Sequence, residues 1–183
     1  MIFFRKTAGF TLLEMILAAM AFSILMSVTV VPFVVILKET QSTLTRNAIR
    51  QDAVLAIERF SRDLNEAREI TSAQTSSITL WWQDTDSDGV RDADELITFS
   101  WDGTAGNPFI RSSVNIALNV NNFTLSYRDV NNAVLTPAPD LTLIQRDSLR
   151  RVEMSLTLSD QNEQITVVTA VTPRNLRQTR GPW

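Results

Sequence analysis

The sequence predicts an α+β protein in which one long N-terminal helix precedes a domain of antiparallel β-strands. Two observations carry this prediction. Residues 10–37 hold a single charge, Glu14, and the apolar spacing of a helix continues beyond them. After Ile70 the pattern changes to short apolar and aromatic runs separated by turn residues, which is typical of strands.

The apolar segment 10–37 is longer than the roughly 20 residues needed to cross a bilayer. A secretory signal peptide has an apolar core of only about 7–15 residues, and its small-residue cleavage site follows that core. Here the small residues Ala8 and Gly9 precede the core. Because Arg5 and Lys6 lie on its N-terminal side, the positive-inside rule places this end in the cytoplasm. We therefore expect a single-pass membrane helix.

Residues 38–70 are polar but keep the spacing of one helix face. Apolar side chains recur at alternating steps of four and three, at Ile49, Ala53, Ile57, Phe60, Leu64 and Ala67. We therefore expect one nearly continuous helix from about Phe10 to about Glu69, with residues 38–70 as its amphipathic part. Within the apolar part, Pro32 removes a main-chain hydrogen bond, which favours a kink or a locally melted turn.

Residues 71–183 are expected to form the β domain. The strands expected there are Ser77–Trp82, Glu95–Trp101, Asn122–Arg128, Arg151–Leu158 and Ile165–Val171. The run Arg151–Leu158 alternates apolar and polar residues, and a short polar turn joins it to Ile165–Val171. These last two strands are therefore expected to form a hairpin. Loops are expected at Gly103–Pro108 and Asn131–Asp140.

The composition excludes several classes of site. The chain has no cysteine and no histidine, so it holds no disulfide, no Ser-His-Asp triad and no histidine-based zinc site. A net charge of −3 argues against nucleic-acid binding, which needs a basic footprint. Asp63 and Glu66 are interpreted as a solvated helix face rather than a catalytic pair. Three tryptophans near the acidic turn are expected to pack in the core and across strands: Trp81, Trp82 and Trp101.

Glu14 ends the stretch G-F-T-L-L-E of residues 9–14, between a basic leader and the apolar run. A charge within a membrane helix costs about 2.5–3.5 kcal/mol on insertion scales, so it indicates a function by default. This order of leader, motif and apolar helix resembles the prepilin processing signal of type IV pilins and type II secretion pseudopilins. The later elements resemble those of J-type minor pseudopilins and minor type IV pilins. An ordinary signal peptide or anchor with an incidental glutamate is the alternative.

The resemblance implies a pilin-like fold and a course of maturation. Prepilin peptidase would cut between Gly9 and Phe10, remove the leader (residues 1–9), and leave Phe10 as an N-methylated N-terminus. Glu14 would then help to dock the subunit into a growing filament, where a terminal ammonium offsets the buried carboxylate. The implied partners are prepilin peptidase, other pilins or pseudopilins contacted through the N-terminal helix, and an inner-membrane assembly platform.

We therefore expect a non-enzymatic minor subunit of a type II secretion pseudopilus. Residues 10–37 would anchor it in the inner membrane, with a cytoplasmic N-terminus and a periplasmic β domain, which in a filament lies in the periplasm or at the cell surface. A minor type IV pilin, acting in pilus assembly, adhesion or DNA uptake, is the first alternative. The others are a calcium-dependent adhesin or receptor at a filament tip and an anchored protein that never assembles.

Residues 84–95 match the twelve-residue calcium-binding loop. Acids stand at its positions 1, 3, 5, 9 and 12, which are Asp84, Asp86, Asp88, Asp92 and Glu95. Gly89 permits the sharp turn, Val90 offers its carbonyl, and Glu95 can bind through both oxygens, with Asp92 acting directly or through water. The flanking runs are strands rather than helices, so we expect a lone Ca²⁺ loop at a hairpin tip. Mg²⁺ fits less well, and an exposed acidic turn without metal is the alternative.

Overall fold

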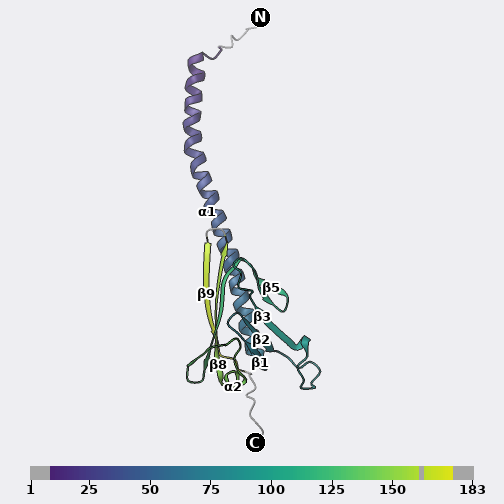
Figure 1. The fold of residues 1–183 in the computed structure, drawn as a ribbon. Coiled ribbons are helices and arrows are strands. Elements are labelled where there is room, and N and C mark those ends of the chain that lie inside the picture. Colours follow the sequence, from purple (N-terminus) through teal and green to yellow (C-terminus); the bar gives the residue numbers. More distant parts are fainter. Residues whose placement is uncertain (1–8, 161–162, 175–183) are drawn as a thin grey trace. The chain divides into compact units, whose positions relative to one another are not determined.

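The computed structural model describes residues 9–160 and 163–174. The chain divides into two compact units, Met1–Leu44 and Thr45–Trp183, and the boundary falls within helix α1 (Leu12–Glu66). The prediction of an α+β protein with one long N-terminal helix and antiparallel strands is confirmed (Figure 1). The predicted leader lies outside the described residues, apart from Gly9.

In the first unit, the segment of α1 from Leu12 to Leu44 exposes its large apolar side chains. By length and composition, α1 is able to cross a membrane. The hydroxyl groups of Ser23, Ser27 and Thr29 donate to main-chain carbonyls one turn earlier, at 2.8–2.9 Å, which pairs these polar groups within an apolar helix. The helix is continuous through Pro32, so this proline melts no turn.

The second unit contains the rest of α1 and two antiparallel sheets, ordered β1-β2-β3-β4-β5 and β7-β6-β8-β9. The first sheet consists of β1 (Glu69–Ala73), β2 (Ser77–Trp81), β3 (Leu96–Ser100), β4 (Phe109–Arg111) and β5 (Val114–Ala117). The second consists of β6 (Val120–Asp129), β7 (Val134–Leu135), β8 (Leu149–Asp160) and β9 (Glu163–Val171). Two short helices are η1 (Ala93–Glu95) and α2 (Leu143–Ser148).

The five predicted strands are all present, and the predicted terminal hairpin is confirmed by the pairing of β8 with β9. They belong to two sheets rather than one, which corrects the prediction of a single sheet. The helix ends at Glu66 rather than near Glu69, because Glu69 and Ile70 already pair with β2 as part of β1. The strands β1, β4 and β5 and the helix α2 were not predicted, and β7 lies in the predicted loop Asn131–Asp140.

A chain of aromatic rings joins α1 to both sheets. The ring of Phe60 in α1 lies 5.3 Å from that of Phe99 in β3, centroid to centroid. Phe99 is 5.9 Å from Phe109 in β4, which is 4.4 Å from Phe123 in β6. The predicted face of the helix is confirmed: Ile49, Ala53, Phe60, Leu64 and Ala67 are buried, and Ile57 is half-buried. One core therefore holds this helix segment and both sheets together.

The prediction that Asp63 faces solvent is wrong. Its side chain is only 1% exposed, and the guanidinium of Arg111 in β4 donates to Oδ2. A second, longer contact joins Oδ1 to Nε of Arg62 at 3.5 Å. Position 63 follows Phe60 by three residues and therefore lies on the buried face, where a carboxylate requires a partner. Glu66, in contrast, is exposed as predicted.

The predicted packing of the three tryptophans is confirmed. Trp81 is buried, with 4% of its surface exposed, and Trp82 and Trp101 are half-buried against the core. The indole N–H of Trp82, the residue after β2, donates to Glu66 Oε2 at 3.0 Å. This hydrogen bond links the end of β2 to the end of α1. These side chains are committed to packing rather than to an open binding surface.

Candidate functional sites

The start of α1 is organised by a reciprocal pair of hydrogen bonds between Thr11 and Glu14. The main-chain N–H and the hydroxyl of Thr11 donate to Glu14 Oε2 at 2.8 and 3.1 Å. The N–H of Glu14 donates back to Thr11 Oγ1 at 3.3 Å. This is a capping box, in which Thr11 is the N-cap and Glu14 the third helical residue. We did not predict this box from the sequence, although its signal, T-x-x-E, is present at residues 11–14.

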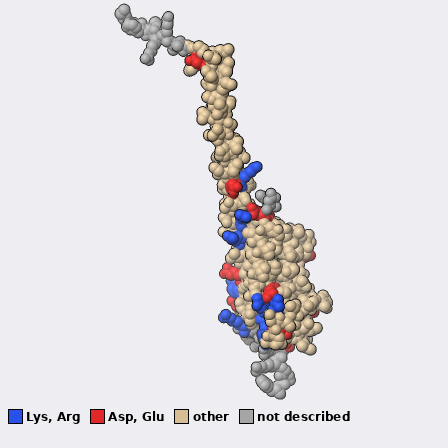
Figure 2. Space-filling model, turned by 90° about the vertical axis from the view of Figure 1, so that its left-hand side faces the viewer, with Lys and Arg blue, Asp and Glu red and all other residues tan. Residues whose placement is uncertain are grey.

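The capping box explains how an acid is accommodated at the edge of an apolar segment. Glu14 lies in the first turn of α1, where the helix dipole favours negative charge and free N–H groups need acceptors. Gly9 and Phe10 lie just before the helix and are exposed. Figure 2 shows acidic atoms at this end of the helix, followed by a long surface without charged side chains. The structure thus presents the Gly9–Phe10 bond in an exposed, non-helical segment.

Three aspartates converge at the loop between β2 and β3. One carboxylate oxygen from each of Asp84, Asp86 and Asp88 lies within 4.8 Å of the others. The N–H of Asp88 donates to Asp86 Oδ1 at 3.2 Å, and the N–H of Val90 donates to Asp88 Oδ1 at 2.7 Å. Gly89 has a φ of +76°, a left-handed conformation that lets the loop turn sharply. The predicted turn geometry is therefore present at the predicted residues.

Asp84 is the buried member of this cluster. Its side chain is 8% exposed, and Arg68 Nη1 donates to Oδ2 at 2.8 Å. The other oxygen, Oδ1, is buried and accepts no hydrogen bond. A buried carboxylate oxygen without a partner is costly, and carboxylate oxygens are the ligands that Ca²⁺ takes. The donor set of the three aspartates therefore fits a hard divalent cation.

Glu95 has a different role from the aspartates in this structure. It is 2% exposed, and both oxygens are occupied: Oε1 accepts from the N–H and hydroxyl of Thr85, and Oε2 from Trp81 Nε1 at 3.0 Å and the N–H of Asp92 at 3.4 Å. These bonds close the loop onto β2. The group of three converging carboxylates includes neither Asp92 nor Glu95, whose roles as ligands stay predictions.

The pKa values of Glu95 and Asp92 are shifted in opposite directions. The hydrogen bond from the Thr85 N–H is the largest cause that lowers the pKa of Glu95, and it outweighs the opposing effect of desolvation. Desolvation and then the negative charges of Asp88 and Asp86 raise the pKa of Asp92. Asp92 therefore experiences the mutual repulsion of the loop, which a bound cation would relieve.

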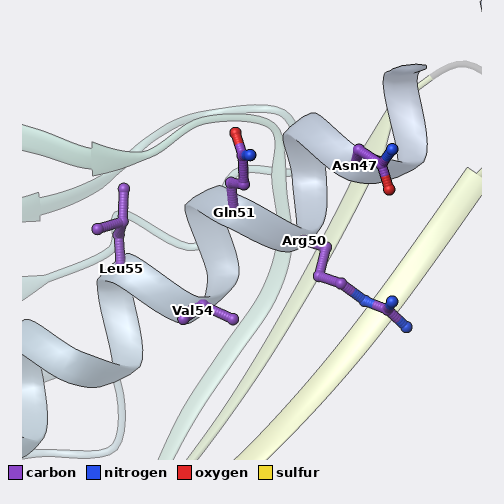
Figure 3. A pocket seen from close by; sticks show the side chains of 5 residues that line it. All are labelled: Asn47, Arg50, Gln51, Val54 and Leu55. Atoms are coloured by element: carbon purple, nitrogen blue, oxygen red, sulfur yellow. The ribbon is translucent and has the colours of Figure 1, made fainter. Parts of the chain in front are cut away.

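A hollow on the exposed side of α1 is lined by Asn47, Arg50, Gln51, Val54 and Leu55 (Figure 3). Its side chains are amide, guanidinium and aliphatic groups, so it offers no acid–base pair and no nucleophile.

Comparison of the chain with protein families, curated proteins and solved structures finds no match. Among the described residues, the features that indicate a function are the start of α1 and the acidic loop.

Proposed function

We propose that this protein is a minor structural subunit of a type II secretion pseudopilus, with no enzymatic activity of its own. The observation that carries the proposal is the start of α1. An exposed Gly9–Phe10 bond is followed, four residues after Phe10, by the capping-box glutamate Glu14 and by an apolar stretch long enough to span a bilayer. These features support the resemblance to the prepilin processing signal, and the α+β architecture is compatible with a pilin-like fold.

The geometry suggests how maturation leads to assembly. Cleavage before Phe10 would create an α-ammonium close in sequence to the Glu14 carboxylate, which is already held at this end of the helix. An ammonium and a carboxylate in an apolar environment stabilise one another only when they are paired. The pair is available within one subunit or between neighbouring subunits. The N-terminal part of α1, which is exposed and apolar, would pack with the helices of those neighbours inside the filament.

Mass measurement of the full chain extracted from membranes tests processing. In cells with active prepilin peptidase we expect loss of residues 1–9 and one added methyl group on Phe10. Gly9→Val is a suitable control, because a Cβ at Gly9 meets no atom within 4 Å and the change leaves the fold undisturbed. The variant should stay uncut. A wild-type chain that still begins at Met1 in these cells contradicts the proposal.

A minor type IV pilin shares these N-terminal features and is the alternative within the same class. Deleting the gene separates the two. Loss of protein secretion with normal pili supports the pseudopilus, whereas loss of pili with normal secretion replaces it by the pilus.

We also propose that residues 84–95 bind one Ca²⁺. The observation that favours this is the unpaired, buried Oδ1 of Asp84 beside Asp86 and Asp88. The remaining ligands would be the Val90 carbonyl, Asp92 directly or through water, and Glu95 if it leaves its present hydrogen bonds. The ion would relieve the repulsion among these acids and fix the β2–β3 hairpin.

Thermal unfolding of the full chain in non-ionic detergent tests calcium binding. A hundredfold excess of Ca²⁺ over its dissociation constant should stabilise the fold by about 2.7 kcal/mol relative to chelator. Replacing both Asp86 and Asp88 by Asn should remove the difference, and both side chains are exposed, so the fold should persist. Equal melting temperatures with no heat of Ca²⁺ binding would leave an acidic turn without metal.

A further inference from the structure

Arg68 lies between α1 and β1 and reaches the acidic loop. Its N–H donates to the Trp81 carbonyl at 2.8 Å, which fixes its main chain to β2. Its guanidinium carbon lies 5.6 Å from the centroid of the Trp81 ring, and Nη1 donates to Asp84 Oδ2 at 2.8 Å. The side chain is 35% exposed. The guanidinium is therefore held in place by an aromatic face and a buried carboxylate.

The loop needs such a cation. Residues 84–95 contain six acids and one base, Arg91. Asp84 is the most buried of the three clustered aspartates, so its charge is the most costly to leave unpaired. Arg68 supplies the opposite charge from outside the loop and does so without a metal ion.

We propose that Arg68 is a built-in counter-cation that competes with Ca²⁺ for Asp84 and thereby sets the affinity of the loop. This inference rests on the proposed calcium site. With Arg68 in place, the loop keeps its shape without the ion and binds Ca²⁺ only weakly. We expect a dissociation constant of roughly 10⁻⁴–10⁻³ M, which is typical of extracellular calcium modules.

Removing Arg68 has two opposing effects on the affinity of the loop for Ca²⁺, and the larger effect decides whether this affinity rises or falls. A positive unit charge about 6 Å from a bound divalent cation repels it and weakens its binding roughly tenfold at the dielectric constant of water. The effect is larger in a partly buried site. Loss of an outer hydrogen bond to a ligand typically weakens metal affinity about 10–100-fold when that bond orients the ligand. Asp84 is already fixed by burial, so we expect the orienting effect to be small and the electrostatic effect to prevail.

Arg91 provides a matched control. Its guanidinium carbon lies 5.8 Å from the centroid of the same Trp81 ring, so the contact resembles that of Arg68. Its Nη2 donates to both oxygens of Glu69 in β1, at 2.8 and 2.7 Å, rather than to an aspartate of the cluster. Arg91→Gln thus removes the same charge and the same aromatic contact without freeing a ligand.

Calorimetric titration of the full chain in non-ionic detergent with CaCl₂ tests the inference. Arg68→Gln should bind Ca²⁺ at least about tenfold more tightly than wild type. Arg68→Lys should stay within a few-fold of wild type, because it keeps the charge, and Arg91→Gln should gain less than Arg68→Gln. Without calcium, Arg68→Gln should melt below wild type, and added Ca²⁺ should close this gap. If Arg68→Gln does not fold, Arg68→Met is used in its place, because methionine keeps an aliphatic side chain against Trp81.

The outcomes separate this inference from the calcium site itself. If wild type binds Ca²⁺ and Arg68→Gln binds it with equal or weaker affinity, the competition is overturned. Weaker binding by Arg68→Gln would show that Arg68 positions Asp84. Absence of binding in the wild type and in every variant removes the calcium site, and the inference with it. Binding by Arg68→Gln alone supports the competition and shows that the native loop is closed to the ion.

Discussion

Replacing Glu14 by Gln and by Val separates its role in the helix cap, which the structure shows, from its role in filament assembly, which we propose. Gln keeps an oxygen that can accept from the N–H and hydroxyl of Thr11, and glutamine is found at this position of capping boxes. Val removes both the acceptor and the charge. Thr11→Ala gives the third combination, because it weakens the cap and keeps the charge.

The magnitudes favour the charge as the decisive property. Loss of a helix cap costs about 0.5–2 kcal/mol, and in a helix of 55 residues it frays only the first turn. Removing a charge from an apolar helix eases insertion by up to about 2.5–3.5 kcal/mol. In the proposed filament, breaking a buried ion pair between Glu14 and the new α-ammonium would cost about 3–5 kcal/mol, which is more than a hundredfold in docking affinity. Both Glu14 variants should therefore insert and be processed, and both should fail to assemble.

The assay is incorporation into sheared filaments, in a strain that lacks the wild-type copy, relative to the amount of mature protein in the membrane. Thr11→Ala should assemble at close to the wild-type level. If Glu14→Gln assembles normally while Thr11→Ala fails, the glutamate acts as a cap and the ion-pair argument is refuted. Loss of processing in Glu14→Gln would instead place the residue in recognition by the peptidase.

Two further predictions concern stability, measured by unfolding of the full chain in non-ionic detergent. Arg111→Gln should cost about 3–5 kcal/mol because it leaves Asp63, 1% exposed, without its close partner, whereas Arg62→Gln should cost less than about 1 kcal/mol because that side chain is 56% exposed. Equal losses in the two variants would contradict the buried pair. The lowered pKa of Glu95 adds stability that is present above the unfolded value of about 4.5 and is lost as pH falls through the lower folded pKa. The stability gap between wild type and Glu95→Gln should therefore narrow below pH 4.5, and a gap that is constant with pH would contradict this role.

The parts of the fold that were predicted correctly depend on local spacing. The uncharged run 10–37 and the steps of four and three after it predicted α1, because helix formation and its buried face are set by residues three and four positions apart. The alternation in Arg151–Leu158 predicted β8 for the same reason, since successive side chains of a strand point to opposite faces. The acidic pattern of residues 84–95 located the cluster of aspartates, which are close in sequence.

By itself, the sequence determined the long helix, the strand pattern, the position of the acidic loop and the absence of histidine and cysteine chemistry. Only the tertiary structure decided how the charges are paired. Asp63 is joined to Arg111, 48 residues away, and Asp84 to Arg68, 16 residues away. The packing of the two sheets against one another likewise depends on contacts such as that of Phe109 in β4 with Phe123 in β6. No local spacing encodes these contacts, because a buried charge or ring takes its partner from whichever element the folded chain brings against it.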